Sequence, residues 1–496
     1  MKASRAAFTC LLFVVAGTMP VAAQGWRLRF DANAQRVSFR GVTPDSVLTG
    51  DVIRSDSAGP VTRDGFAATC GFDAWCRFYR PGDIRSGIPA SVGLDLSMWG
   101  LGITGLSIRM NGRTMGDLSG DRLWPGTTPA LRLVEGYAEY LRGGLTARAG
   151  RLLQLGRLAA SGSSGLDGIR GSFRTSNDRL EFGAYAGWGL ARGTILPITS
   201  PAVNPLLDFQ PESRQIVVGV TSGFHLPRFD AEVEYRRELD PMTNYIVAER
   251  AGFSAQFRPL GRVRIVTGAD YDIAQGRVGS ADATIGYSGK RVWATLGAKH
   301  YRPYFDLWTV WGVFSAVPYD GAIATLAVTP ISRLQLRGRG EWFRYQDAEA
   351  NTPAVPLKDR GYRWGLEATL TPLPAWTVEL GGHGELQPGA SSSGIDGRVV
   401  WRARERVDLS LNGGSLERPL ELRFQDAGVR WAGAALDYHV GDRWRAGVSA
   451  DRYWESRDRP DALAFDWNQW RLSARVSVTL KSSADRWLLP PASRAP

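Results

Sequence analysis

The chain has 496 residues, a formal net charge of +11, 44% hydrophobic residues, 58 glycines and 18 tryptophans. This length holds two or three ordinary domains or one large closed sheet. No stretch approaches the ~20 uncharged apolar residues of a membrane-spanning helix, which excludes a helical membrane protein. Nearly all the positive charge is arginine. In a secreted protein this basic balance points to anionic solutes, polysaccharide or lipid headgroups and not to nucleic acid.

The first 23 residues have the features of a secretory signal peptide. Lys2 and Arg5 precede a short apolar run over residues 6–16, and Val21 and Ala23 place small residues before a cleavage point. We predict that residues 1–23 are removed after Ala23. Loss of Lys2 and Arg5 then lowers the formal net charge from +11 to +9.

Residues 24–90 differ from the chain that follows. Two short candidate strands, 26–30 and 36–40, precede turn-rich sequence that contains Cys70 and Cys76. The spacing of these cysteines suits a small disulfide loop, which an oxidising compartment permits. Two interpretations of the segment remain open: a cap, plug or periplasmic segment, or an irregular first hairpin of a barrel.

Strict two-residue alternation runs from residue 91 to residue 480. In 470–480, Trp470, Leu472 and Val476 share the apolar phase, while Arg471 and Arg475 share the polar phase. Successive side chains of a strand point to opposite faces, so this period predicts strands with two different solvents on their two sides. The same pattern recurs in 94–110, 229–238, 262–273, 362–370, 376–386 and 443–453.

The connections between these strands alternate between short turns and long polar loops. Nine short turns and long loops such as 113–130, 190–213 and 302–319 predict about 18–20 strands, with short periplasmic turns and long extracellular loops. The predicted fold is therefore all-β: a transmembrane antiparallel β-barrel over residues 91–480, closed by pairing of the last strand with residues near 92–112, followed by a periplasmic tail at 481–496. A large soluble β-sandwich or β-solenoid is the alternative.

Aromatic residues at strand ends fit the interfacial girdles of such a barrel. These residues are Trp364, Trp376, Trp401, Trp431, Trp444, Trp454 and Trp470.

The water-facing phase is rich in arginine, and an arginine-lined pore concentrates anions. The predicted pore-lining residues are Arg236, Arg262, Arg264, Lys299, Arg337, Arg339, Arg363, Arg443, Arg445, Arg471 and Arg475. The alternative is that these cations pair with carboxylates of the same phase and stiffen the wall.

Two segments are further candidates for function. The proline-rich loop 190–213 folds inward as a constriction or remains an ordinary surface loop. The aromatic cluster at 301–308 with Trp311 stacks on sugar rings or belongs to the rim.

Signals for catalysis are poor. The four histidines have no metal-ligand spacing, and His383, which shares a phase with Glu379 and Glu385, has no paired nucleophile. We therefore expect a protein that is not an enzyme, with no catalytic residues, no metal site and no cofactor.

The sequence resembles bacterial outer-membrane β-barrels of porin type. The stretch from Tyr137 to Arg151, with Gly156 and the Asp167-Gly168 pair, is similar to a hairpin of alginate-export and related specific-porin barrels, where an "RAGR" strand leads to a loop ending in "DG". The resemblance implies a passage for acidic sugars or small carboxylates.

We expect a porin-like channel of the Gram-negative outer membrane for passive transport of small hydrophilic solutes, with a preference for anions. Its partners would be outer-membrane lipids, the barrel-assembly machinery and small solutes, and no nucleic acid. The alternative is a non-conducting barrel that binds a surface polysaccharide or an envelope protein.

Overall fold

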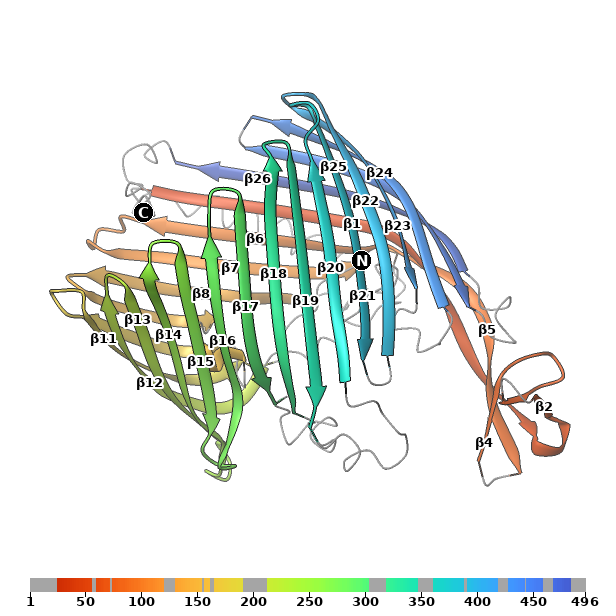
Figure 1. The fold of residues 1–496 in the computed structure, drawn as a ribbon, viewed down its shortest axis with the longest axis horizontal. Helices are drawn as coiled ribbons and strands as arrows, with labels where there is room; N and C mark the ends of the chain where they lie inside the picture. Colours follow the sequence, from red (N-terminus) through yellow and green to blue (C-terminus); the bar gives the residue numbers. More distant parts are fainter. Residues whose placement is uncertain are drawn as a thin grey trace.

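The computed structural model describes residues 25–55, 59–71, 74–119, 130–153, 156–160, 165–190, 212–302, 318–346, 360–387, 390–417, 427–441, 443–457 and 467–482. No helix within these ranges is long and apolar enough to cross a membrane. The regular elements are almost all strands, and most of them form one sheet, which we call the wall (Figure 1).

The strands of that wall are β1 (Gly25–Leu48), β6 (Pro89–Trp99), β7 (Leu106–Asp117), β8 (Ala130–Arg142), β9 (Leu145–Leu153), β10 (Gly165–Arg174), β11 (Leu180–Leu190), β12 (Glu212–Leu226), β13 (Phe229–Leu239), β14 (Ile246–Leu260), β15 (Val263–Asp272), β16 (Arg277–Ser288), β17 (Val292–Tyr301), β18 (Tyr319–Ile331), β19 (Leu334–Tyr345), β20 (Arg360–Leu370), β21 (Trp376–Gln387), β22 (Ala390–Arg404), β23 (Val407–Glu417), β24 (Ala427–Val440), β25 (Trp444–Arg457) and β26 (Trp467–Lys481). The remaining elements are β2 (Ile53–Ser55), β3 (Gly59–Val61), β4 (Ala68–Cys70), β5 (Trp75–Gly87) and the 3-10 helices η1 (Thr49–Asp51) and η2 (Arg157–Ala160).

The wall is a closed antiparallel barrel of 22 strands. Each strand pairs with its neighbours in the chain, and β1 closes the ring because it pairs with β26 on one side and β6 on the other. Arg27 lies opposite Lys481, and Gly25 lies opposite Trp99. Closure pairs the backbone groups of the first and last strands, which an open edge in hydrocarbon would leave unsatisfied.

The predicted all-β antiparallel barrel is confirmed, with 22 strands in place of about 18–20. The two additional strands are β1 and β6, so the wall begins at Gly25 and not at residue 91. The last strand closes onto β1 and not onto residues near 92–112. The first half of β1 has the same alternation as the other strands, with Leu28 and Phe30 in one phase and Arg27 and Arg29 in the other.

The two faces of the wall differ as the alternation predicts. Leu366 and Leu411, in the apolar phase of their strands, are 61% and 63% exposed, while Arg236 and Arg471, in the opposite phase, are each 1% exposed. Large exposed apolar side chains on the outside and charged side chains inside are the arrangement of a barrel in lipid with a polar lumen.

Tryptophans of the outer phase contribute to an aromatic belt. Trp376 and Trp401 are cross-strand partners with stacked rings 5.5 Å apart. The position of Trp431 near a strand end predicts that it belongs to this belt. It lies instead in the inward phase of β24, where it packs against Val429 and Tyr453 inside the barrel. One residue of register separates the two faces, so its position could not be fixed from the end of the strand alone.

We predict that Leu472→Arg destabilises the folded barrel by about 2–4 kcal/mol, because it places a charge on the lipid face near the middle of β26. Ser477→Arg, on the same strand but facing the lumen, is the matched control and should be close to neutral. Denaturant unfolding of protein refolded into lipid vesicles measures both. Equal destabilisation by the two variants would contradict the assignment of faces.

The chain leaves the barrel at the rim with the long loops. Beyond Arg36, which still pairs with Leu472, the second half of β1 pairs with β5 alone. We call this two-stranded extension, Val37–Leu48 with Trp75–Gly87, the arm. At ~3.3 Å per residue it reaches roughly 40 Å from the wall, and Figure 1 shows it projecting from the barrel.

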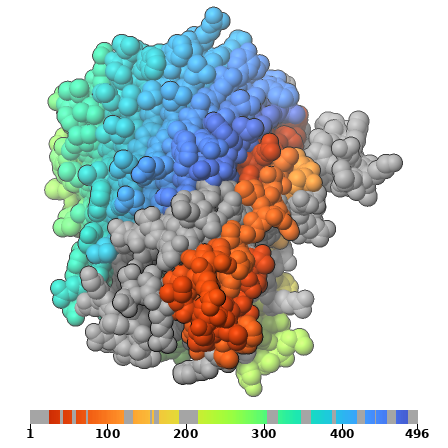
Figure 2. Space-filling model, turned by 90° about the vertical axis from the view of Figure 1, so that its right-hand side faces the viewer, coloured from red at the N-terminus to blue at the C-terminus, as the bar shows by residue number. Residues whose placement is uncertain are grey.

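The tip of the arm carries a compact β-structure, which we call the knob and define as the described residues of 49–71. Figure 2 shows the arm and knob, in red and orange, in front of the barrel. Residues 24–90 therefore do not form one unit, and the two interpretations of the segment apply to different parts of it at most. Residues 25–36 are wall, and the arm and knob lie at the long-loop rim, which is extracellular in barrels of this type.

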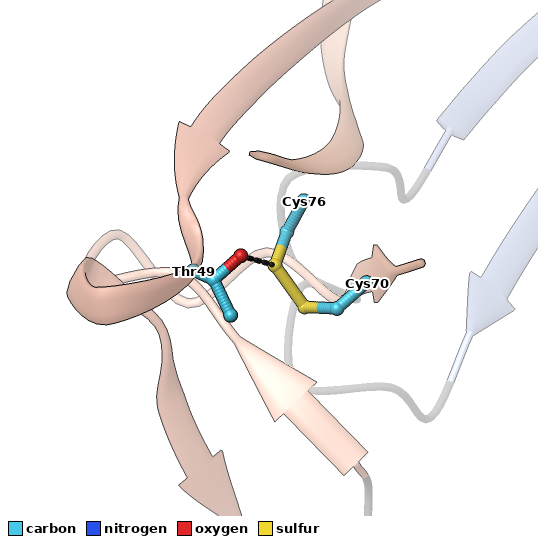
Figure 3. The surroundings of a disulfide bond; sticks show 3 residues. All are labelled: Thr49, Cys70 and Cys76. Atoms are coloured by element: carbon cyan, nitrogen blue, oxygen red, sulfur yellow. Dashed lines mark hydrogen bonds between the residues drawn. A yellow bond between two sulfur atoms is a disulfide. The ribbon is translucent and has the colours of Figure 1, made fainter. Parts of the chain in front are cut away.

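A small core around the cysteine pair joins the knob to the adjoining end of the arm strand β5 (Figure 3). Phe66, Ala68, Cys76 and Phe78 are buried together. The Cys70 and Cys76 sulfurs form a disulfide of 2.04 Å, and the Thr49 hydroxyl oxygen lies 3.6 Å from the Cys76 sulfur. A core this small needs such a cross-link because it buries little apolar surface.

An arginine covers this core from the solvent side. The Arg80 guanidinium lies 5.4 Å from the Phe66 ring centroid and 5.1 Å from that of Phe78, and it binds Asp45 and Asp64. Its hydrogen bond holds the pKa of the Asp45 carboxyl below the ordinary value. Arg80 thus joins the arm strand β1 to the knob.

Replacing Cys70 and Cys76 by serine should destabilise the knob by about 2 kcal/mol, because the cross-link no longer restricts the unfolded loop. Hydrogen exchange should rise in residues 59–71 and stay unchanged in the barrel strand β25, which shares no core with the knob. Unchanged exchange in the knob would show that its core needs no cross-link.

Candidate functional site

The lumen wall is built from the inward phase of the strands, and most predicted pore-lining residues lie in it. Cross-strand register places Arg236, Lys299, Arg337, Arg339, Arg363, Arg445, Arg471 and Arg475 on this side, together with Arg264. Arg443 lines the lumen cavity at the short-turn end. Arg262 lies in the turn between β14 and β15, so it is a rim residue and not part of the wall.

Several of these cations are neutralised by neighbours. Their closest nitrogen to carboxylate-oxygen distances are 2.9 Å for Arg236–Glu238, 2.5 Å for Lys299–Glu341, 3.4 Å for Arg337–Glu367, 2.8 Å for Arg363–Glu385 and 2.6 Å for Arg475–Asp437. Arg471 is buried, with its guanidinium 4.7 Å from the Tyr453 ring centroid. For these residues the alternative interpretation applies: the charges stiffen the wall.

Glycine makes one of these pairs possible. Gly447 lies between Asp437 and Arg475 in the register of β24, β25 and β26. A Cβ atom at this position would lie 2.3 Å from Asp437 Oδ1 and 2.8 Å from Arg475 Nε. The ion pair therefore spans the strand between its partners only because that strand has no side chain there.

A second set of cations surrounds an open cavity of about 1710 Å³ at the short-turn end of the lumen. We call this cavity the basic chamber. Strands β1, β6, β7 and β23–β26 form it, and they lie side by side across the closure of the barrel (Figure 1). Its charged lining residues are Arg27, Arg29, Arg109, Arg443, Arg445, Arg475 and Lys481, with Asp31, Asp408 and Asp437.

The three carboxylates of the chamber are already engaged. Asp31 lies 2.8 Å from Arg29, Asp437 binds Arg475, and Asp408 lies 3.2 Å from His439. Among the residues that the structure describes, no carboxylate lies within ion-pair distance of the other five cations, Arg27, Arg109, Arg443, Arg445 and Lys481. The chamber therefore has a net positive field that can hold or attract anions.

Four cations of this chamber are absent from the predicted pore-lining set. Arg27 and Arg29 lie on β1, which was not assigned to the barrel, and Lys481 was assigned to the tail that follows the last strand. Arg109 lies in the water-facing phase of the predicted stretch 94–110 but was not named as pore-lining. The signal was present in the alternation of Trp26, Leu28 and Phe30 with the two arginines.

A segment between β9 and β10 folds into the lumen. Residues 156–160, including η2, contact β13, β14 and β15, and two strands of the wall separate β10 from β13. The segment therefore crosses the lumen as a chord, which narrows the passage. The loop predicted to do this, 190–213, lies outside the described residues apart from its two ends.

The inward segment is held by a charged anchor. Arg157 donates to Ser280 at 2.9 Å and binds Asp282, and its Nε lies 3.9 Å from Asp270. The Leu158 amide donates to Glu234 at 3.3 Å, and the Leu158 side chain is fully buried. These contacts link residues more than 70 positions apart in sequence.

Glycines in the inward segment and in the facing wall leave room for their close contact. Gly156 has φ of +136°, and a Cβ atom there would lie 3.0 Å from the Glu234 carboxylate. A Cβ atom at Gly252 would lie 3.0 Å from the Leu158 side chain. The close approach of the segment to the wall therefore requires small residues at these positions.

The hairpin that resembles alginate-export barrels has a clear structural role. Arg151 forms a two-pronged contact with Asp167, at 2.7 and 2.6 Å, across the pairing of β9 and β10. Arg148 binds Glu139 at 2.6 Å. Gly150 has φ of +134°, and a Cβ atom there would lie 2.2 Å from the Gly136 carbonyl oxygen. These residues fix the local wall.

The described residues contain no group of three or more His, Cys, Asp or Glu side chains arranged to hold a metal ion. His383, Glu379 and Glu385 do share the inward phase of β21. Glu385, however, is engaged by Arg363.

Comparison with known proteins gives a distant likeness only. No protein-family model and no curated protein matches the sequence. Among solved structures, the siderophore receptor PirA from Acinetobacter baumannii is 8% identical with a TM-score of 0.46, and the copper transporter OprC is 11% identical with a TM-score of 0.46; each comparison covers 93% of this chain and 81% of the other. The outer membrane protein OpdK from Pseudomonas aeruginosa is 9% identical with a TM-score of 0.40, over 92% of this chain and 99% of the other.

Likeness at these scores is no guide to activity, so the class of the protein follows from its own architecture. A closed antiparallel barrel with an apolar outer face, a charged lumen and short turns at one rim is a transmembrane barrel of the bacterial outer membrane.

We predict that Arg157→Ala releases the inward segment and raises single-channel conductance. The variant removes charge-assisted hydrogen bonds worth roughly 1.5–3 kcal/mol. It also removes the Arg157 cation that lies beside Asp270 and Asp282. Arg237→Ala, which removes an arginine paired with Glu249 on the outer face, is the control and should leave conductance unchanged. Wild-type conductance in Arg157→Ala would mean that the segment does not limit the passage.

Proposed function

We propose that the protein is a porin-type channel for passive passage of small hydrophilic solutes through the outer membrane, with a preference for anions. The observation that carries this proposal is the basic chamber, where Arg27, Arg109, Arg443, Arg445 and Lys481 face open space with no carboxylate within ion-pair distance of them among the described residues. Fixed guanidinium groups bind carboxylate or phosphate groups in a two-pronged geometry and raise the local anion concentration.

The inward segment supports passage with selection. A wide barrel without a constriction would let solutes pass with little contact with the wall. The inward segment, residues 156–160, occupies part of the lumen and so brings solutes closer to the wall. The proposal includes no catalytic step, no cofactor and no nucleic-acid partner. It includes outer-membrane lipids and the barrel-assembly machinery as partners, because the outer face requires lipid and a barrel of this class must be inserted.

The finer resemblance to alginate-export barrels remains a prediction about the solute. Small carboxylates and acidic sugars fit an unpaired arginine cluster equally well, since both present a carboxylate to it.

A second candidate function rests on the tip of the arm. Trp75 and Tyr79 are 52% and 57% exposed and stand in one phase of β5 with Arg77 between them. Exposed aromatic residues at the end of the arm offer a contact surface for a surface polysaccharide or envelope protein, which is the role of the alternative, a non-conducting binding barrel. Loss of cell-surface polysaccharide binding in Trp75→Ala/Tyr79→Ala, together with no current through the wild type, would support this candidate over the channel.

We predict that Arg443→Gln/Arg445→Gln lowers the anion-to-cation permeability ratio roughly sixteenfold, because each removed charge acts in opposite directions on anions and cations and so changes the ratio about fourfold. Each charge removed changes the energy of a monovalent ion about 8 Å away by roughly 0.5 kcal/mol in water, which is about twofold. Reversal potentials in planar bilayers under a salt gradient measure the ratio. The effect should shrink at high ionic strength because salt screens these charges.

The matched control is Arg63→Gln/Arg77→Gln, which removes the same charge from the knob and arm, outside the lumen. It should leave the permeability ratio unchanged. An equal shift in both double variants would assign the selectivity to overall charge and not to the basic chamber.

A further inference from the structure

A row of tyrosines lines the lumen at the long-loop end, away from the basic chamber. Tyr301, Tyr319 and Tyr345 are direct cross-strand partners on β17, β18 and β19. Their ring centroids are 5.4 Å apart for Tyr301–Tyr319 and 5.5 Å apart for Tyr319–Tyr345. All three share the inward phase with Lys299, while Trp342 and Leu326 occupy the outer phase.

The tyrosine row packs against a buried phenylalanine. Phe343, the next inward residue of β19, is 1% exposed and packs against the row, with ring centroids 5.7 Å from Tyr319 and 5.6 Å from Tyr345. Gly361 leaves room for this ring, since a Cβ atom there would lie 2.3 Å from it. Tyr301 is 43% exposed, so the row presents an accessible ring on a rigid base.

Charges of both signs lie deeper in the lumen on β17 and β19 and on the next two strands, β20 and β21. Lys299 lies 2.5 Å from Glu341 and 5.0 Å from the Tyr319 ring centroid. Arg363 binds Glu385 at 2.8 Å, and its guanidinium lies 5.1 Å from the Phe343 ring centroid. This group offers hydrogen-bond donors and acceptors without a strong net charge.

We propose that the tyrosine row, with Lys299, Arg363 and Glu385, is a binding site for the hexopyranose ring of a saccharide, and that the buried Glu341 positions the two cations. A pyranose has an apolar C–H face that packs on an aromatic ring and a hydroxyl edge that both donates and accepts hydrogen bonds. A simple anion would meet Glu385, and a simple cation would meet Lys299 and Arg363. A neutral polyhydroxylated ring satisfies both signs.

This inference deepens the proposed function, because it names a class of solute for the same lumen. The basic chamber lies at the opposite end, so a saccharide that also carries a carboxylate would contact both sites in turn. A neutral saccharide would use the tyrosine row alone.

Binding is tested on the full-length protein in lipid nanodiscs by saturation-transfer NMR, which needs no conduction. The probes are methyl glucopyranoside, glucuronate and benzoate. We expect ring-proton saturation of both sugars in the wild type. Tyr319→Ala and Tyr301→Ala should each weaken sugar binding on the order of three- to tenfold, and the lipid-facing Tyr271→Ala, which is 45% exposed, should not.

Two results would overturn the site: no saturation of either sugar in folded wild type, or loss of binding in Tyr271→Ala as large as in Tyr319→Ala. Saturation of benzoate without saturation of either sugar would show that the site binds an aromatic acid and not a saccharide. Tyr301→Ala is the safer variant for folding, because Tyr301 ends its strand and is partly exposed.

Failure of this inference is distinguishable from failure of the proposed function. Anion-selective current with no sugar binding would leave the channel and remove the tyrosine site. Sugar binding without current would keep the site and remove the channel.

Discussion

Backbone hydrogen bonding in lipid is the constraint on which this structure depends. Every N–H and C=O group of a membrane strand needs a protein partner, and the pairing of β1 with β26 supplies the last set of partners. That pairing brings Arg27 and Arg29 into the lumen beside strands from the other end of the chain. The basic chamber is therefore a product of closure. The chamber combines residues that are distant in sequence. Closure also fixes where the arm leaves the wall.

Once the barrel is closed, the lumen charges divide into two kinds. Buried cations such as Arg236 and Arg471 pair or pack within the wall and contribute rigidity. The cations around the chamber face open space and can act on a solute. Counting arginines in the water-facing phase does not separate the two kinds, because cross-strand register decides which arginine meets a carboxylate. Arg475 has Asp437 across Gly447, whereas the neighbouring Arg445 has no such partner in the described residues.

The fold was largely readable from the sequence, since alternation over ten residues directly reports a strand with two solvents. The phase of Arg471 and Arg475 followed from that pattern. The first strand was missed because β1 continues past Arg36 into the arm without a turn, so its boundary lacks a sequence signal. The inward segment at Arg157 could not be predicted, because its position depends on Ser280 and Asp282, more than 120 residues away.

The most direct test of this account is the reversal potential of the wild-type protein in a planar bilayer under a potassium chloride gradient. The account predicts a current through single channels and a reversal potential with the sign of chloride selectivity, because the chamber has five cations without carboxylate partners in the described chain. A reversal potential with the sign of potassium selectivity, or no current at any voltage from correctly folded barrel, would contradict it.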